Sequence, residues 1–146
     1  RRCLIPATGY YEWATELGKY KPKQPFYISN KDKSTIAIAG IYEQWINPQT
    51  SSPITTTAII TREVVGILKP IHHRMPVILP KSLWSSWLSN KTLSGDEISD
   101  YLKMIDLEKP DAGLTFWPVS DEVNNARNSG SQLAAQIPLP SSGTLF

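Results

Sequence analysis

Short apolar stretches, separated by polar turns, recur along most of the chain, and they alternate with polar positions as half-buried strands do. This pattern, together with many β-branched and aromatic residues, predicts strands at 3–5, 10–13, 25–29, 35–45, 53–61, 76–79 and 114–119. Within the strand at 10–13, alternation places Tyr10 and Glu12 on one face and Tyr11 and Trp13 on the other.

Three segments instead follow a helical pattern. Residues 61–68 predict a short helix with Thr61 as its N-cap. After Ser82, apolar residues fall at helical spacing over 83–88. The run 94–97, Ser-Gly-Asp-Glu, is a capping box that predicts a helix to about residue 105.

Many strands in meander order with short helices between them predict an α+β fold. We expect a mainly antiparallel, barrel-like sheet with short flanking helices. Residues 1–138 are predicted to belong to a single domain, with a lysine-rich loop at 16–23 and a loose Pro-, Ser- and Gly-containing tail at 139–146.

Composition limits the classes of function. The chain has 146 residues, of which 40% are hydrophobic and 19% charged, as in a globular domain, and its net charge of +2 is too small to indicate a polyanion partner. Cys3 is the only cysteine, which excludes an internal disulfide and a cysteine zinc cluster. No apolar run approaches a signal peptide or membrane span, so we expect a reducing, intracellular setting.

The chain opens Arg-Arg-Cys-Leu-Ile-Pro, without a methionine, and passes directly into a strand-like segment. Natural termini tend to begin with a few loose polar residues. We therefore expect this chain to be the carboxy-terminal portion of a domain whose amino-terminal part is absent.

Two ionisable side chains have apolar or aromatic neighbours in the sequence. Glu12 lies between Tyr11 and Trp13, and His72 lies in the run Ile71-His72-His73-Arg74-Met75-Pro76. A carboxyl and an imidazole placed in this way are candidates for a general acid–base pair. The alternatives are a glutamate that faces water and a structural histidine at a strand start. Because adjacent histidines in an extended segment point to opposite faces, they are poor joint metal ligands, and we predict no metal or cofactor.

Other candidates carry less weight. Glu43 occurs in a similar sequence, 40–45, and is a decoy for Glu12. A papain-like role for Cys3 with His72 is disfavoured, because a small thiol in an apolar strand is ordinarily buried and inert. The chain has no Gly-x-Ser-x-Gly elbow, phosphate loop or dinucleotide fingerprint. Its tryptophans are mostly core residues by pattern, and one or two are candidates for stacking on nucleobases.

Ordered motifs over nearly the whole chain resemble the SOS response-associated peptidase (SRAP) family. The motifs are Arg2-Cys3-Leu4-Ile5-Pro6-Ala7, Gly9-Tyr10-Tyr11-Glu12-Trp13, Lys23-Gln24-Pro25-Phe26-Tyr27-Ile28, Ala39-Gly40-Ile41-Tyr42-Glu43, Ile59-Ile60-Thr61, residues 71–79, Pro118-Val119-Ser120 and Val123-Asn124.

The resemblance implies a protein that recognises abasic sites in single-stranded DNA and becomes covalently joined to them. The family uses an amino-terminal cysteine, whose amine and thiol form a thiazolidine with the opened sugar, and a self-processing peptidase activity that frees this cysteine. An α-amine suits this chemistry, because its low pKa leaves more of it neutral at pH 7. The implied partner is abasic single-stranded DNA, bound by a monomer in the bacterial cytoplasm near the nucleoid, without cofactor or membrane.

Position by position, the resemblance assigns catalytic roles to Glu12, as an acid–base group, and His72, as a proton donor to the opening sugar. It places Thr61 in the lining of the active site and Arg74 on the DNA backbone. Arg2 is a further candidate for a phosphate contact.

The chain departs from the family in three respects. The family's opening Cys-Gly-Arg and an early asparagine-containing segment are not present, and His73 stands where aspartate is common. Cys3 belongs to the internal Arg-Cys-Leu-Ile-Pro motif and is not the family nucleophile. We therefore expect no crosslinking by this chain alone. The alternatives are a peptidase that acts on other proteins and a non-catalytic module that binds single-stranded DNA.

Overall fold

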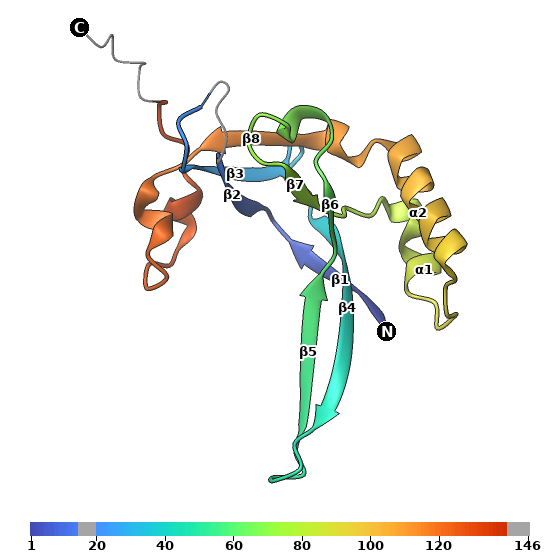
Figure 1. Ribbon diagram of the computed structural model, residues 1–146. Coiled ribbons are helices and arrows are strands. Elements are labelled where there is room, and N and C mark those ends of the chain that lie inside the picture. Colours follow the sequence, from blue (N-terminus) through green and yellow to red (C-terminus); the bar gives the residue numbers. More distant parts are fainter. Residues whose placement is uncertain (15–19, 140–146) are drawn as a thin grey trace, which may run out of the picture.

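Antiparallel sheets form the body of the protein in the computed structural model, which describes residues 1–14 and 20–139 (Figure 1). One sheet has the order β1 (Arg2–Ala7), β4 (Ile36–Ile46), β5 (Pro53–Ile59). A second has the order β2 (Tyr10–Ala14), β3 (Gln24–Asn30), β8 (Leu114–Pro118), and a third pairs β6 (Thr61–Glu63) with β7 (Arg74–Pro76). Parts of the predicted loop at 16–23 and tail at 139–146 lie outside the described residues.

Two α-helices, α1 (Trp84–Trp87) and α2 (Gly95–Glu108), lie together beside the sheet that contains β1 (Figure 1). The predicted capping box opens α2: the Ser94 hydroxyl accepts from the Glu97 amide, and the Glu97 carboxylate accepts from the Ser94 amide. Five 3₁₀ turns complete the described elements: η1 (Gly66–Leu68), η2 (Lys81–Leu83), η3 (Pro110–Gly113), η4 (Asp121–Asn124) and η5 (Ser131–Ala134).

The α+β class and the antiparallel pairing are confirmed, but the predicted barrel is wrong, because no sheet closes within the described residues. The cause lies in β4. Its first half pairs with β1, from Ala7↔Ile36 to Arg2↔Ile41, and its second half pairs with β5, from Gly40↔Ile59 to Ile46↔Pro53. Since the two pairings overlap only at Gly40 and Ile41, the sheet is staggered, and the end of β4 leaves the body with β5 as a two-stranded ribbon (Figure 1).

The predicted helix at 61–68 is also wrong. Thr61 begins strand β6, which pairs with β7 from Thr61↔Pro76 to Glu63↔Arg74, and only η1 (Gly66–Leu68) is helical. Two β-branched residues, Val64 and Val65, weaken the helical alternative, and Gly66 adopts a left-handed conformation with φ of 59°.

One hydrophobic cluster joins all three sheets. It contains Ile28 of β3, Ile36 and Ile38 of β4, Leu68 of η1, Met75 of β7, Leu114 of β8, and Ile78 from the segment after β7. Backbone hydrogen bonds also connect the sheets. The Ala39 amide donates to the Val77 carbonyl over 2.8 Å, and the Val77 amide donates to the Ile60 carbonyl over 2.9 Å. The segment between η1 and β7, which carries His72, is therefore held against the other two sheets.

Candidate active site

The face of β2 that carries Glu12 is the core-facing one. Glu12 is paired with Phe26 and Tyr10 with Ile28, and both partners on β3 are fully buried. Ala14, two residues beyond Glu12 on the same face, is also fully buried. The predicted alternation is confirmed, and it places a carboxyl on the buried side of a sheet.

Aromatic side chains cover the opposite face of this sheet. The rings of Tyr11 and Tyr27 lie 5.1 Å apart, and those of Tyr27 and Trp117 lie 5.3 Å apart. The Trp13 indole donates to Asn124 Oδ1 over 2.7 Å. Asn124 belongs to the late Val123-Asn124 motif, whose contact the sequence could not show, and it ties η4 to the strand that holds Glu12.

Gly9, just before β2, is required by close packing. A Cβ atom there would lie 2.5 Å from the Ile28 carbonyl oxygen and 2.4 Å from a ring carbon of Tyr27. Neither a backbone oxygen nor a packed ring can move away cheaply. This glycine lets the turn before β2 press against β3 and so fixes the start of the strand.

His72 lies in a turn between η1 and β7, and its neighbour Ile71 anchors it. Ile71 is 2% exposed and forms a cluster with Ala14 and Phe26, the residues that flank Glu12 on its face. The Arg74 amide donates to His72 Nδ1 over 3.1 Å. The same Nδ1 lies 3.2 Å from the Arg74 carbonyl oxygen, so the main chain of Arg74 engages this nitrogen of the ring.

The two histidines do not diverge as an extended segment would require. Their ring centroids are 4.3 Å apart with an interplanar angle of 30°. The His72 amide donates to the Leu68 carbonyl, so the backbone is turned here rather than extended. The two rings therefore do not point to opposite faces as an extended segment would require: they lie side by side, with His72 half-buried and His73 exposed.

The Glu12 carboxyl and the histidine pair lie within electrostatic reach of each other. Burial raises the pKa of Glu12 above its ordinary value of 4.5, while the charges of His72 and His73 and a hydrogen bond from the Trp13 amide act in the opposite direction. A raised pKa suits a carboxyl that exchanges protons near neutrality. The structure thus brings Glu12 together with His72, and adds His73, whose electrostatic effect sequence reasoning missed.

Tyr10 is a second buried polar group on the same face. Its hydroxyl is inaccessible and has no hydrogen-bond partner among the described residues. Burial and the nearby Glu12 carboxylate both raise the pKa of Tyr10. The phenol therefore stays protonated beside Glu12.

Thr61 and Arg74 form a pair at the start of β6. The Arg74 guanidinium donates to Thr61 Oγ1 from Nε over 3.0 Å and from Nη2 over 2.6 Å, and to the Thr61 carbonyl over 2.9 Å. Arg74 is exposed. Thr61 therefore orients an exposed cation in the strand that directly follows His72.

Glu43 and Arg2 are placed differently. The exposed Glu43 pairs with Arg1 over 2.8 Å, and a hydrogen bond from the Gln44 amide and the charge of Arg1 lower its pKa. Arg2 donates to the carbonyls of Trp87 over 2.6 Å, Ser89 over 2.6 Å and Lys91 over 2.9 Å. It thus joins β1 to the end of α1, and its predicted phosphate contact stays a prediction.

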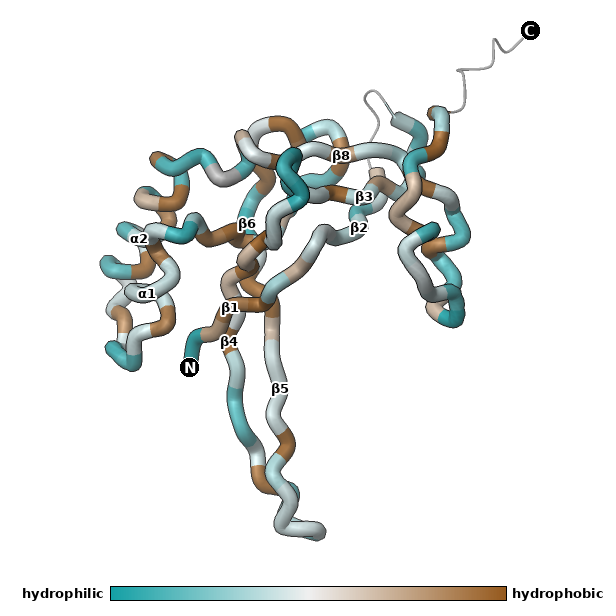
Figure 2. Tube along the Cα trace, turned by 180° about the vertical axis from the view of Figure 1, so that it is seen from behind, coloured by the Kyte–Doolittle hydropathy of each residue, from teal (hydrophilic) through white to brown (hydrophobic). Residues whose placement is uncertain are grey.

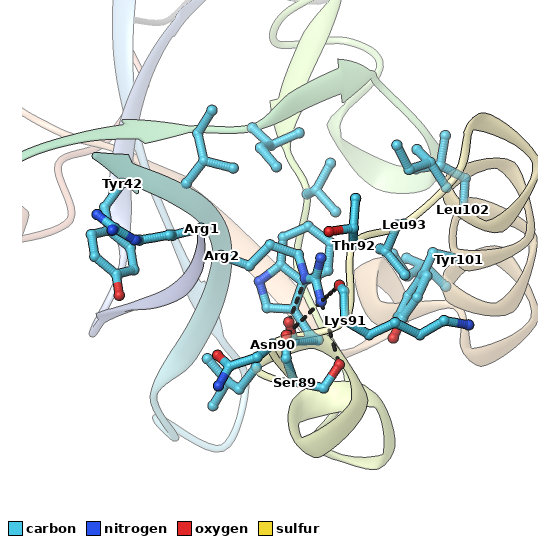
Figure 3. A pocket seen from close by; sticks show the side chains of 17 residues that line it. Arg1, Arg2, Tyr42, Ser89, Asn90, Lys91, Thr92, Leu93, Tyr101 and Leu102 are labelled. Atoms are coloured by element: carbon cyan, nitrogen blue, oxygen red, sulfur yellow. Dashed lines mark hydrogen bonds between the residues drawn. The ribbon is translucent and has the colours of Figure 1, made fainter. Parts of the chain in front are cut away.

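A cavity beside helix α2 does not include the candidate residues Glu12 and His72. It has a volume of about 550 Å³ and lies between the start of β1, the loop after α1 and helix α2 (Figure 3). None of Glu12, Thr61, His72 and Arg74 lines it. Glu12 lies instead on β2, and His72 lies in the turn before β7.

Cys3 lies in β1, paired with Gly40, and its carbonyl accepts a bond from the Trp87 indole over 2.9 Å. Among residues 1–14 and 20–139, His, Cys, Asp and Glu side chains form no group of three that could hold a metal ion. In the same part of the chain, no helix is long and apolar enough to cross a membrane.

Comparison with known proteins identifies relatives. The family model described as "SOS response associated peptidase (SRAP)" matches residues 1–126. The abasic site processing protein YoaM of Bacillus subtilis is 37% identical over 133 residues, which cover 91% of this chain and 56% of YoaM. The abasic site processing protein HMCES of Pongo abelii is 31% identical over 164 residues, which cover 95% of this chain and 44% of HMCES.

The fold has solved counterparts as well. A crystal structure of a Bacteroides thetaiotaomicron protein superposes with a TM-score of 0.75 at 28% identity, and the match covers 94% of this chain and 57% of that one. The chain thus spans about half the length of the relatives it matches. Since the family model matches most of the chain, the resemblance read from the sequence is confirmed, and the chain belongs to the SOS response associated peptidase (SRAP) family.

Proposed function

We propose that the protein processes abasic sites in single-stranded DNA, as the names of its relatives indicate for them. We assign to the whole protein the formation of a covalent thiazolidine crosslink with the DNA through an amino-terminal cysteine. The observation that carries the proposal is the half-buried Glu12 carboxyl beside the His72–His73 pair in a member of this family.

The nucleophile must be a cysteine with a free amine. The amine attacks the C1′ aldehyde of the ring-opened sugar, and loss of water gives an imine; the thiol then adds to the imine carbon and its proton passes to the nitrogen. No oxidant or reductant is needed. Cys3 cannot do this in the chain as it stands, because its nitrogen is in a peptide bond to Arg2. Its carbonyl also accepts a hydrogen bond from the Trp87 indole.

Glu12 suits the proton transfers of this sequence. Burial raises the pKa of Glu12, which brings the carboxyl closer to the range in which it can act as both acid and base. As an acid it protonates the hydroxyl that leaves as water, and as a base it takes the proton of the thiol. The Arg74 main chain engages Nδ1 of His72, which leaves Nε2 to assist opening of the sugar ring as a proton donor.

Arg74 suits contact with a phosphate of the strand. Its guanidinium is exposed and held by Thr61, so little side-chain entropy is lost when it meets an anion. We also assign to the whole protein the peptidase activity in the family description, as hydrolysis of the peptide bond that precedes the nucleophilic cysteine.

The test uses a chimera in which this chain replaces the matched 133 residues of YoaM, so that the rest of YoaM supplies the further polypeptide. We expect the chimera to form a denaturation-resistant adduct with a single-stranded oligonucleotide that contains an abasic site. This chain alone should form none. The rate of adduct formation should fall by roughly 10²-fold or more in the Glu12→Gln and His72→Ala variants of the chimera.

Glu43→Gln is the matched control, because Glu43 is the exposed glutamate of the similar segment. It should crosslink at the unaltered rate. A chimera without an adduct, or with an adduct equally fast in Glu12→Gln, contradicts the proposal. Cleavage of an unrelated peptide without DNA would favour a peptidase of other proteins, and DNA binding with no adduct would favour a binding module.

A further inference from the structure

Tyr10 of β2 has a buried hydroxyl that its position in the core does not explain. The strand runs beside β3 (Figure 2), where Tyr10 is paired with Ile28 and packs against the hydrophobic cluster that joins the three sheets. The hydroxyl is inaccessible to solvent and has no hydrogen-bond partner within residues 1–14 and 20–139. Because a buried hydroxyl without a partner destabilises a fold, phenylalanine would serve a purely structural role better here.

Glu12 is the ionisable group that shares a face of β2 with Tyr10. The two residues are two positions apart, which in a strand places them on one side and roughly 7 Å apart along the backbone. A tyrosine side chain is long enough to bring its hydroxyl to a carboxyl at that separation. The other side chains in the same cluster are apolar, among them Ile28 of β3 and the valines Val64 and Val65 that follow β6.

The two groups also interact electrostatically. Burial and the Glu12 carboxylate both raise the pKa of Tyr10, so the phenol keeps its proton at neutral pH and meets a carboxylate as a donor. From outside β2, the charges that act on Glu12 are those of His72 and His73 in the turn before β7. The Arg74 guanidinium, which follows them, is exposed and donates to β6. Tyr10 is therefore the uncharged donor beside a carboxyl that otherwise faces imidazoles.

We propose that Tyr10 is a positioning residue for Glu12: its hydroxyl donates a hydrogen bond to the Glu12 carboxylate once that group has given its proton to the hydroxyl that leaves as water. Such bonds are often long in the free enzyme and shorten in the loaded site. The bond holds the carboxylate in place until it takes the proton of the thiol. Tyr10 keeps its own proton throughout, so the balance of the reaction is unchanged. This inference deepens the proposed function and rests on it.

The first test titrates Glu12 in this chain without DNA, by NMR of its side-chain carboxyl carbon, so that it is independent of crosslinking. Tyr10→Phe removes one oxygen and keeps the ring. Since the lost hydroxyl would have stabilised the carboxylate, the midpoint of the Glu12 titration should move to higher pH. Tyr11→Phe is the matched control, because Tyr11 lies on the opposite face against Tyr27, and it should leave the midpoint in place. An unmoved midpoint in Tyr10→Phe, or a lower one, overturns the proposal.

Stability against pH gives a second readout that a merely structural tyrosine would not move. Well below pH 4.5, where Glu12 is protonated, Tyr10→Phe should be at least as stable as the wild type. It should lose stability relative to the wild type as pH rises through the folded-state pKa of Glu12, because the variant holds the proton to higher pH. In a Glu12→Gln background the effect of Tyr10→Phe should not depend on pH. A difference that is independent of pH in both backgrounds would contradict the hydrogen bond.

The reaction itself is tested in the YoaM chimera. Tyr10→Phe should slow crosslinking to abasic single-stranded DNA roughly tenfold, as expected for one bond to a charged group. The limb of the pH–rate profile that reports Glu12 should move to higher pH, while Tyr11→Phe should change neither quantity. An unaltered rate and profile in Tyr10→Phe overturn its part in the reaction. If no chimera forms an adduct, the proposed function fails, whereas an unmoved Glu12 midpoint contradicts this inference alone.

Discussion

Glu12 is the residue at which stability and the proposed chemistry oppose each other. It lies on the core-facing side of β2, and burial raises its pKa above 4.5. Between its unfolded and folded pKa values the folded state holds more protons, so ionisation of Glu12 costs stability as pH rises through that window. Polar groups kept at such a cost are typical of functional sites.

Glu12→Gln should therefore stabilise the protein at neutral pH. The variant cannot ionise at this position, so its advantage should be absent well below pH 4.5 and should grow as pH rises above that value. Chemical denaturation of both proteins across this range measures it. Glu43→Gln should give no such gain, because the pKa of Glu43 is lowered rather than raised. Parallel pH curves for the wild type and Glu12→Gln would contradict the placement of Glu12.

Arg74 is expected to act on DNA through its charge. If it neutralises one phosphate, Arg74→Ala should weaken binding to single-stranded oligonucleotides and reduce the slope of log affinity against log salt by about 0.7. Lys103→Ala is a control, since Lys103 is an exposed cation of α2 that pairs with Asp100. A salt slope that is equal in the wild type and Arg74→Ala would exclude the predicted phosphate contact.

At the scale of elements, alternation and capping predicted most of the fold because each strand or cap depends on its neighbours in sequence. The strands at 10–13 and 25–29 and the capping box at 94–97 required no distant information. The segment 61–68 was mispredicted, because pairing with Arg74–Pro76 decides that Thr61–Glu63 is a strand. Likewise, the turn that stacks His72 on His73 is set by contacts of Ile71 with β2 and β3.

Arg2 has a role at this scale, because it joins β1 to α1. Arg2→Ala should lower the free energy of unfolding by about 3 kcal/mol, as bonds from a charged group to three carbonyls are lost. Arg1→Ala should change it by less than about 1 kcal/mol, since Arg1 makes an exposed ion pair with Glu43. Equal effects of the two substitutions in urea unfolding would rule out this role for Arg2.

At the scale of the whole molecule, the site depends on elements that are far apart in sequence. Glu12 comes from β2 and His72 from the turn before β7, and the buried Ile71, Phe26 and Ala14 hold the two together. The sequence could propose these residues one by one through family motifs, but their proximity comes from how three sheets share one core. Local sequence patterns also could not predict that the β1–β4–β5 sheet is open and staggered, because this form depends on the register of β4 with two partner strands.

The central claim, that Glu12 and His72 work in one site, is tested most directly by a double-mutant cycle on the rate of crosslinking by the YoaM chimera to abasic single-stranded DNA. Groups that act as a unit give strongly non-additive losses. We predict that the combined Glu12→Gln and His72→Ala variant is hardly slower than the slower single variant. Losses that simply multiply, or single variants that crosslink at the wild-type rate, would contradict the claim.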